Sequence, residues 1–337
     1  MMKYLLMNLE EENDSFFLNT VVVVLIFSFI LYLLRKYIKG KQYTENTKAT
    51  DKIIIITGAN TGIGKQLSRE LNLRKGKVYM FCRDEKKAFD AKVSLTKYGC
   101  DSTRFITIKC DLTSISSIKN AVEEFKKHES HLDILVNNAG VMLVPKFTLT
   151  EDNCELTWQS NYLGHFVLTE LVLPLLEKSS GGRIINVSSY LHTKCHEINL
   201  EKINDKSYFG PLKSYNMSKL AQVMHAKELT RRIREKNPLS KVTINSCEPG
   251  VVNTDLLRHT FLKYDIIANI TKPFKWFFFK TAQDGAQCPL FLALSKNVDS
   301  ISGKHFNNLT EKSDINKIAN DKELCKELYD YSLQYIN

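Results

Sequence analysis

Short apolar runs rich in β-branched residues alternate with helical patterns from residue 52 onward, and this alternation restricts the fold more than any other feature. The runs cover residues 52–57, 77–82, 105–109, 132–137, 183–187 and 242–246, with a weaker one at 304–307. Strands that alternate with helices are typical of a parallel sheet covered by helices on both faces. We therefore expect an α/β fold, with a Rossmann-type doubly wound parallel sheet of about seven strands in a single domain.

An uncharged stretch of 19 residues, 16–34, precedes this domain. A helix of that length spans roughly the ~30 Å hydrocarbon layer of a bilayer. Acidic residues precede the stretch and basic residues follow it, so the positive-inside rule predicts that the domain after it faces the cytosol. The stretch ends in Leu34-Arg35-Lys36 without a small-residue cleavage site, which disfavours a signal peptide.

These features divide the chain into four parts. We expect an acidic N-terminal tail at 1–15, a transmembrane anchor at 16–34, a basic linker at 35–51 and the α/β domain at 52–337. A single uncleaved anchor suggests a single-pass protein of the endoplasmic reticulum membrane.

The balance of charge and the cysteines exclude several other classes. The 47 basic residues exceed the 37 acidic ones, but part of the excess lies beside the anchor, where an anionic lipid surface would attract it. No basic run is interleaved with aromatic residues as in a nucleic-acid site, so we expect membrane lipid and no nucleic acid as partner. The eight cysteines form no CxxC pair, which argues against a zinc ribbon or a thioredoxin-like site.

A glycine-rich turn follows the first strand directly. Residues 57–64 read TGANTGIG and lead into an amphipathic helix. Glycines in this position allow a tight turn and a close approach of the backbone to a pyrophosphate, which the helix N-terminus then faces. Lys65 is followed by Gln66, so the ending of a P-loop is absent and NTP hydrolysis is disfavoured. The pattern predicts a dinucleotide site.

The end of the second strand indicates which dinucleotide binds. An NAD site places an acidic residue there for the ribose hydroxyl, whereas this strand ends in Phe81-Cys82-Arg83. A guanidinium can grip a 2′-phosphate with two hydrogen bonds, which favours NADP(H). Alternatively, Arg83 points to solvent and Asp84 binds the ribose. We prefer Asp84 as the N-cap of the next helix.

Tyr215 and Lys219 are the candidate catalytic pair. They lie four residues apart at the start of a long helical pattern and so share one face. An ammonium beside a phenol lowers the phenol pKa, which suits proton exchange with a carbonyl or alcohol. Three other pairs have the same spacing: Tyr32/Lys36, Tyr37/Lys41 and Tyr190/Lys194. Only Tyr215/Lys219 heads a helix after a strand whose end carries serines, Ser188 and Ser189, positioned to face it.

At this point the chain resembles the short-chain dehydrogenases/reductases. The matching motifs are TGANTGIG (57–64), Asp111, NNAG (137–140), Asn161, Ser189, YNMSK (215–219) and PGVVNT (249–254), in the order typical of that family. The resemblance implies Tyr215 as general acid/base, Lys219 as its tuning partner and ribose ligand, Ser189 as the group that orients the substrate oxygen, and Asn161 as part of a water-linked proton relay. The resemblance also implies a set of cofactor-binding residues, to which Arg83 is added. They are Gly58, Asn60, Thr61, Gly62, Ile63, Gly64, Asp111, Leu112, Asn138, Ala139, Gly140, Tyr215, Lys219, Pro249, Gly250, Val252 and Thr254.

Within this family the chain looks most like the membrane-anchored, NADP(H)-dependent retinol dehydrogenases. The local matches include NYLGHFVLT (161–169), RIINVSSYLH (183–192), KTAQDGAQ (280–287) and SGKHF (302–306). Cys247-Glu248 departs from the pattern, because a histidine is more usual before Pro249. The resemblance implies hydride transfer to or from a retinoid or similar lipid alcohol/aldehyde. The alternatives are a steroid or fatty-aldehyde reductase, or an NADPH-binding membrane scaffold without turnover; homo-oligomer formation stays open.

Two further features bear on the substrate and on metal binding. Residues 273–279 read PFKWFFF, and with the lysines around them they suggest a lid over an apolar substrate or a membrane contact, the alternative being an ordinary core helix. His192 and His196 are spaced like metal ligands but have no third ligand nearby in the sequence, so we expect no metal site.

Overall fold

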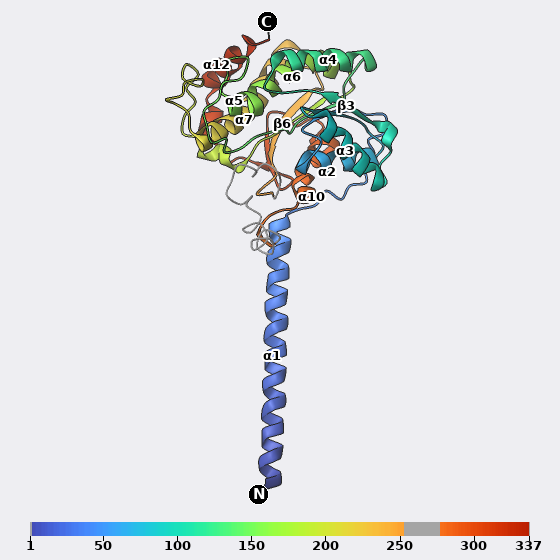
Figure 1. The fold of residues 1–337 in the computed structure, drawn as a ribbon, viewed down its shortest axis with the longest axis vertical. Helices are drawn as coiled ribbons and strands as arrows, with labels where there is room; N and C mark the ends of the chain where they lie inside the picture. Colours follow the sequence, from blue (N-terminus) through green and yellow to red (C-terminus); the bar gives the residue numbers. More distant parts are fainter. Residues whose placement is uncertain (1, 253–276, 337) are drawn as a thin grey trace.

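One eight-stranded sheet organises the residues that this computed structural model describes, 2–252 and 277–336 (Figure 1). The strand order is β3-β2-β1-β4-β5-β6-β7-β8. The strands are β1 (Ile53–Thr57), β2 (Lys77–Cys82), β3 (Phe105–Lys109), β4 (Ile134–Asn137), β5 (Arg183–Val187), β6 (Thr243–Glu248), β7 (His305–Asn307) and β8 (Thr310–Lys312). Pairings from β3 to β7 are parallel, which confirms the predicted doubly wound parallel sheet.

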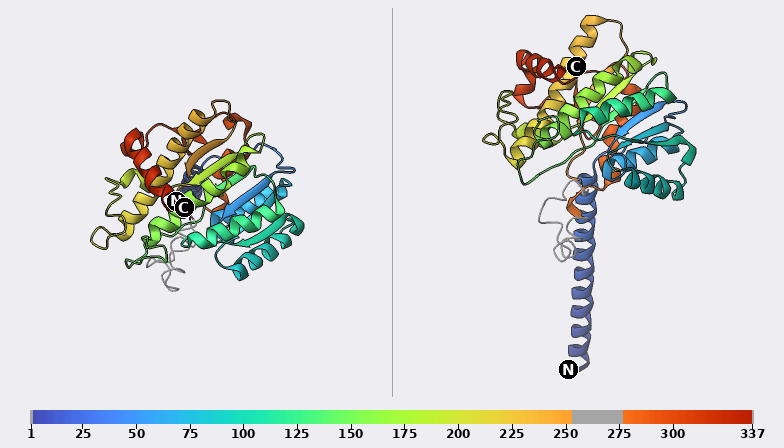
Figure 2. Two further views of the ribbon diagram at one scale, coloured as in Figure 1. Left: turned by 90° about the horizontal axis from the view of Figure 1, so that it is seen from above. Right: turned by 45° about the horizontal axis from the view of Figure 1, so that its top comes forward.

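Helices cover both faces of the sheet (Figure 2). Buried side chains of α2 (Gly62–Leu73), α3 (Glu85–Lys97) and α11 (Gln287–Leu294) share one apolar cluster. Those of α4 (Ile115–His128), α6 (Gly164–Glu177), α7 (Pro211–Lys236) and α12 (Lys322–Leu333) share the other. Shorter helices are α5 (Leu156–Trp158) and α10 (Ala282–Gly285). The central strands β1 and β4 are buried along their whole length, which explains their uninterrupted apolar sequence.

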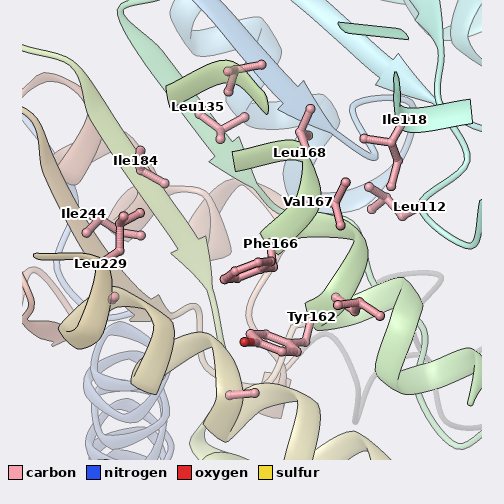
Figure 3. Close-up of a cluster of buried hydrophobic side chains, with 14 of the residues drawn as sticks. Leu112, Ile118, Leu135, Tyr162, Phe166, Val167, Leu168, Ile184, Leu229 and Ile244 are labelled. Atoms are coloured by element: carbon pink, nitrogen blue, oxygen red, sulfur yellow. The ribbon is translucent and has the colours of Figure 1, made fainter. Parts of the chain in front are cut away.

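The second apolar cluster, to which α4, α6, α7 and α12 contribute, packs against the half of the sheet that presents the candidate catalytic residues. Phe166 and Tyr162 point from α6 and the turn before it towards Leu229 of α7 and towards Ile184 and Ile244 of the sheet (Figure 3). Interiors packed in this way have low compressibility, so the helices that present the site are held in place.

The eighth strand was not predicted. β7 and β8 form an antiparallel hairpin whose two turn residues, Asn308 and Leu309, have φ angles of 52° and 62°. A two-residue turn with both φ values positive favours Asn followed by Gly. The second turn residue here is Leu309 instead of Gly, so the sequence does not indicate the turn. The side chains of β8 are all exposed, and therefore the strand carries no apolar pattern.

Helix α1 (Met2–Lys39) projects from the domain (Figure 1). Its segment Phe17–Lys39 is long and apolar enough to cross a membrane, and the most apolar part of this segment is not buried against the protein. The predicted anchor, 16–34, lies within α1, which continues five residues further than expected at its C-terminal end.

The end of α1 is docked on the catalytic domain. Arg35 is 7% exposed, and its guanidinium donates hydrogen bonds of 3.0 and 2.9 Å to the carbonyl oxygens of Phe277 and Phe279. The backbone N–H of Lys41 donates to Asn308 Oδ1 at 2.6 Å. Because Asn308 directly follows β7, the membrane helix meets the domain at the carboxyl edge of the sheet. The segment 40–51 then lies against the domain, with Tyr43 and Ala49 buried.

Two buried histidines predict a loss of stability in acid. Burial lowers the pKa of His165 and of His225 to about 3, against about 6.5 in an unfolded chain. Between these pH values the unfolded state binds more protons than the folded state. The free energy of unfolding therefore keeps its full value above about pH 6.5 and decreases as the pH drops towards 3. The slope is at most about 1.4 kcal/mol per pH unit for each histidine.

We therefore expect His225→Phe to be less sensitive to acid than the wild type. The phenylalanine ring fits the aromatic surroundings of His225, which include Phe166 and Tyr329. Urea unfolding of the full-length protein in detergent at about pH 5 and about pH 7 measures the difference. The exposed His196 offers a matched control in His196→Gln, which should behave as the wild type. An unchanged pH slope in His225→Phe would contradict the assignment.

Candidate active site

The predicted site residues that the structure describes gather at the carboxyl edge of the sheet, where open α/β folds bind their ligands. The glycine-rich turn follows β1, Arg83 follows β2, and Asp111 follows β3. Residues 138–140 follow β4, Ser189 follows β5, and Pro249 follows β6. Tyr215 and Lys219 reach the same edge from α7.

The turn between β1 and α2 has the form of a phosphate cradle. Gly58 has a φ of +63°, which favours glycine. A Cβ on Gly64 would lie 2.4 Å from the Gly58 carbonyl oxygen, so a side chain there cannot fit without moving the turn. Thr61 caps α2 without a side-chain hydrogen bond, which leaves the first-turn N–H groups suited to an anion. Asn60 is partly buried in this turn, and Ile63 packs against the core behind it.

Arg83 and Asp111 lie on the β2–β3 side of this edge. The Arg83 side chain is largely exposed, and its Nε lies 4.0 Å from Asp111 Oδ2. Asp84 accepts a 3.0 Å hydrogen bond from the backbone N–H of Lys87, which confirms it as the N-cap of α3. Leu112 is buried in the core beneath. An exposed guanidinium therefore lies at the end of β2, next to the turn.

Thr57 ties the turn to the segment after β4, a role that the sequence did not reveal. Its hydroxyl accepts hydrogen bonds from the backbone N–H groups of Asn138 (2.9 Å) and Ala139 (3.0 Å). The Asn138 side chain returns a 2.8 Å bond to the Thr57 carbonyl. Buried His165 lies 2.8 Å from the same hydroxyl. This network fixes both walls of the dinucleotide cradle.

Tyr215 is buried at the N-terminal end of α7, 2% exposed. Burial raises its pKa to about 12, although the nearby Ser189 hydroxyl acts in the opposite direction and lowers the pKa. The net lowering expected from Lys219 is therefore not found. The phenol is protonated at neutral pH and can donate a proton to an oxygen placed beside it and Ser189.

Lys219 lies one helical turn further along, also buried. Its Nζ is 5.7 Å from the centroid of the Tyr215 ring and donates a 2.8 Å hydrogen bond to the Val187 carbonyl. Complete burial lowers its pKa to about 7. A Cβ on Gly140 would come within 3.7 Å of Nζ, so the segment after β4 approaches the lysine closely.

Asn161 occupies a π-helical turn, Gln159–Leu163, of the kind often found at functional sites. Its side chain exchanges two hydrogen bonds with the backbone of Val141, at 2.8 and 2.9 Å, which fixes the strand-end segment opposite α7. Its backbone carbonyl accepts a 2.6 Å bond from Gln222 Nε2, while Gln222 Oε1 lies 3.5 Å from Lys219 Nζ. Gln222 thus bridges Asn161 and Lys219. Gln222 was not predicted from the sequence, because nothing in its spacing distinguishes it.

The segment after β6 closes the other side of the site. Gly250 has a φ of +83°, and Val252 forms a parallel bridge with Lys280. Pro249 is partly buried. Thr254 and residues 272–276 of the aromatic segment lie outside the described residues. Of that segment, Phe278 is exposed, in line with either a lid or a membrane contact.

The three competing tyrosine–lysine pairs do not join the site. Tyr190 is 56% exposed although Lys194 lies over its ring, and the other two pairs lie on or beside α1. Position in the fold therefore separates Tyr215 from its sequence equivalents.

Comparison with known proteins gives consistent matches. The family model of short chain dehydrogenases matches residues 52–265. Retinol dehydrogenase 13 of Mus musculus is 38% identical over 306 residues, which cover 90% of this chain and 89% of the relative. Retinol dehydrogenase 11 of Homo sapiens is 34% identical over 321 residues, covering 92% and 95%.

Solved structures agree on the fold. An uncharacterised protein from Mycobacterium paratuberculosis is 28% identical with a TM-score of 0.68, covering 88% of this chain and 98% of that chain. An NAD(P)-dependent gluconate 5-dehydrogenase from Beutenbergia cavernae, solved with bound NADP, has a TM-score of 0.58 at 19% identity, covering 77% and 96%.

Fold, site and matches define an oxidoreductase that uses a nicotinamide cofactor. The chain belongs to the short-chain dehydrogenase/reductase family and, within it, resembles the retinol dehydrogenases.

Proposed function

We propose that the protein is an NADP(H)-dependent oxidoreductase for a retinoid or a similar lipid alcohol/aldehyde. The observation that carries the proposal is the buried Tyr215 hydroxyl, which lies near Ser189 and one helical turn from Lys219, at the sheet edge that holds the glycine turn. The retinol dehydrogenases that match most of the chain support the substrate class.

In this proposal a bound nicotinamide supplies or accepts the hydride. The glycine turn at 58–64 would hold the pyrophosphate, and the groups after β3, β4 and β6 would hold the adenine and nicotinamide ends. Ser189 and Tyr215 would hydrogen-bond to the substrate oxygen. Because the phenol is protonated at neutral pH, Tyr215 is poised to donate a proton to a carbonyl, which favours reduction.

The role of Lys219 would depend on the fixed orientation of its Nζ atom. Its Nζ is held by the Val187 carbonyl and by Gln222, which in turn is held by the Asn161 carbonyl. With its pKa lowered to about 7, the amine loses its proton readily near neutral pH. Gln222 would then orient the amine towards the ribose side of the site.

We further propose a single-pass membrane protein of the endoplasmic reticulum whose domain, 52–337, faces the cytosol. The basic residues that follow the apolar stretch support this orientation. Helix α1 meets the domain at the carboxyl edge of the sheet, so the site opens on the side from which a lipid substrate would arrive.

A substrate panel tests the proposed function. The full-length protein in detergent should reduce retinal with NADPH faster than it reduces steroid ketones or straight-chain fatty aldehydes, and NADPH should be preferred to NADH. A preference for a steroid or fatty aldehyde would move the substrate assignment to that class. NADPH binding without turnover of any member would support the scaffold alternative.

Arg83 predicts the cofactor preference. In Arg83→Ser, loss of a charge-assisted contact of about 1.5–3 kcal/mol should raise the KM for NADPH by about 10–100-fold and leave that for NADH nearly unchanged. Arg69 on α2 provides a control, because it pairs with Glu70 and Arg69→Ser removes the same charge elsewhere on the nucleotide half. Steady-state kinetics with both cofactors measures the effect. Equal changes for NADPH and NADH would refute a 2′-phosphate role.

A further inference from the structure

Three buried polar side chains converge beside the active site, outside the proton-transfer residues. They are His192, Glu248 and His305, which are 1%, 6% and 3% exposed. His192 lies in the turn after Ser189, Glu248 ends β6, and His305 begins β7. One ligand atom from each lies within 4.8 Å of the others.

Both imidazoles are oriented by their second ring nitrogen. His192 Nδ1 lies 2.7 Å from the Ser189 carbonyl oxygen, which can only accept, so Nδ1 carries the proton and Nε2 presents its lone pair. His305 Nδ1 lies 2.9 Å from Ser246 Oγ, whose hydroxyl can donate to the Lys304 carbonyl at 3.5 Å. When it does so, His305 Nε2 also presents a lone pair.

With His305 in this tautomer, the cluster brings acceptors together without a donor. His192 Nε2, Glu248 Oε2 and His305 Nε2 are buried and have no hydrogen-bond partner among the described residues. The last two atoms are 4.0 Å apart. Each unsatisfied buried polar atom lowers the stability of the fold by about 1–3 kcal/mol. A cation bound between the three atoms would remove this cost.

We propose that His192, Glu248 and His305 bind a divalent transition-metal ion, with Zn²⁺ the best match to two imidazoles and one carboxylate. Ligand atoms around tetrahedral Zn²⁺ lie about 3.4 Å apart, so each atom has to move by less than about 1 Å. Metal-bound histidines typically donate their other N–H to a carbonyl or a polar side chain, as His192 does here to the Ser189 carbonyl and as His305 does when Ser246 donates to Lys304.

The surroundings leave room for the remaining ligand. The three side chains line a cavity of about 560 Å³, which also contains Asp314 and Asn316. Water in this cavity could complete the coordination. Lys194, Lys312 and Lys317 also line it, so direct ligation rather than a negative field has to supply the affinity.

The site would join the loop after β5 to β6 and β7. His192 holds the carbonyl of Ser189, and Glu248 precedes Pro249, so the metal would stiffen the substrate side of the active site without touching the reacting atoms. This inference does not depend on the proposed substrate.

Metal titration of the full-length protein tests the proposal. The protein is stripped with EDTA and loaded with Zn²⁺, which should give one bound zinc per chain and a higher unfolding temperature. Loading with Co²⁺ instead should produce the visible absorption of a four-coordinate site. In Glu248→Gln and His305→Asn the Co²⁺ affinity should fall by at least about 10-fold. His196→Gln, an exposed histidine of the same cavity, should bind Co²⁺ as the wild type does.

The outcomes separate a metal site from a proton-sharing cluster. Absence of stoichiometric metal in the wild type, or Co²⁺ binding that survives both ligand substitutions, overturns the proposal. NADPH binding by each variant reports whether it has folded. If the variants do not fold, nitrogen NMR of the wild type decides: Zn²⁺ must shift the Nε2 signals of two histidines, and pH-dependent shifts without any effect of Zn²⁺ would identify a shared proton instead.

Discussion

Tyr215→Phe is expected to lower kcat for retinal reduction by about 10²–10⁴-fold while NADPH binding is retained. The substitution removes one oxygen atom from a fully packed position and leaves the ring, so the fold should survive. The lost oxygen is the one that Ser189 contacts and that is protonated at neutral pH. Single-turnover measurement of NADPH oxidation isolates the effect on the chemical step.

Tyr190→Phe is the matched control for this substitution. Tyr190 also has a lysine four residues later, and Lys194 lies 5.6 Å from its ring centroid. Its side chain is exposed, so its loss should change kcat by less than twofold, roughly within the scatter of surface substitutions. If Tyr190→Phe were inactive and Tyr215→Phe active, the assignment of the acid would be reversed.

Gly64→Ala is expected to weaken NADPH binding by at least about 100-fold. Its Cβ would lie 2.4 Å from the Gly58 carbonyl oxygen and 2.5 Å from Asn138 Nδ2, so the turn has to move. That movement misaligns N–H groups whose charge-assisted bonds to phosphate contribute about 1.5–3 kcal/mol each, and two such bonds account for the loss. Quenching or enhancement of NADPH fluorescence gives the dissociation constant.

Gly181→Ala is the control for the glycine turn. A Cβ at Gly181 would meet no atom within 4 Å, so this variant should bind NADPH as the wild type does. Thermal unfolding distinguishes a lost cradle from a lost fold, because Gly64→Ala should retain a cooperative transition. Unchanged NADPH affinity in Gly64→Ala would mean that the dinucleotide binds elsewhere.

Much of this architecture could be predicted because local and global signals agree. The four isoleucines 53–56 are apolar throughout and lie in a strand that is buried along its whole length, and the glycine turn joins this strand to the following helix. Asp84 was correctly assigned as a cap because its position relative to the following helix is a local property. Strand β8 was missed because its exposed side chains leave no pattern.

The interactions that require tertiary structure could not be predicted. Gln222 acquires its position only when the π-helical turn at 159–163 packs beside α7. In the sequence, His192 was considered as a metal ligand only together with His196. The fold instead places it beside Glu248 and His305, which come from two strands that are distant in the sequence. The pKa of Tyr215 also depends on burial, which no spacing along the chain reveals.

The contacts of Arg35 with the backbone of Phe277 and Phe279 hold α1 at a set angle to the sheet. Once α1 is embedded, the catalytic centre stays at constant height above the bilayer and cannot search the aqueous phase. Turnover should then follow the surface density of substrate in the leaflet, so that diluting vesicles at a constant mole fraction of substrate leaves the rate per enzyme unchanged.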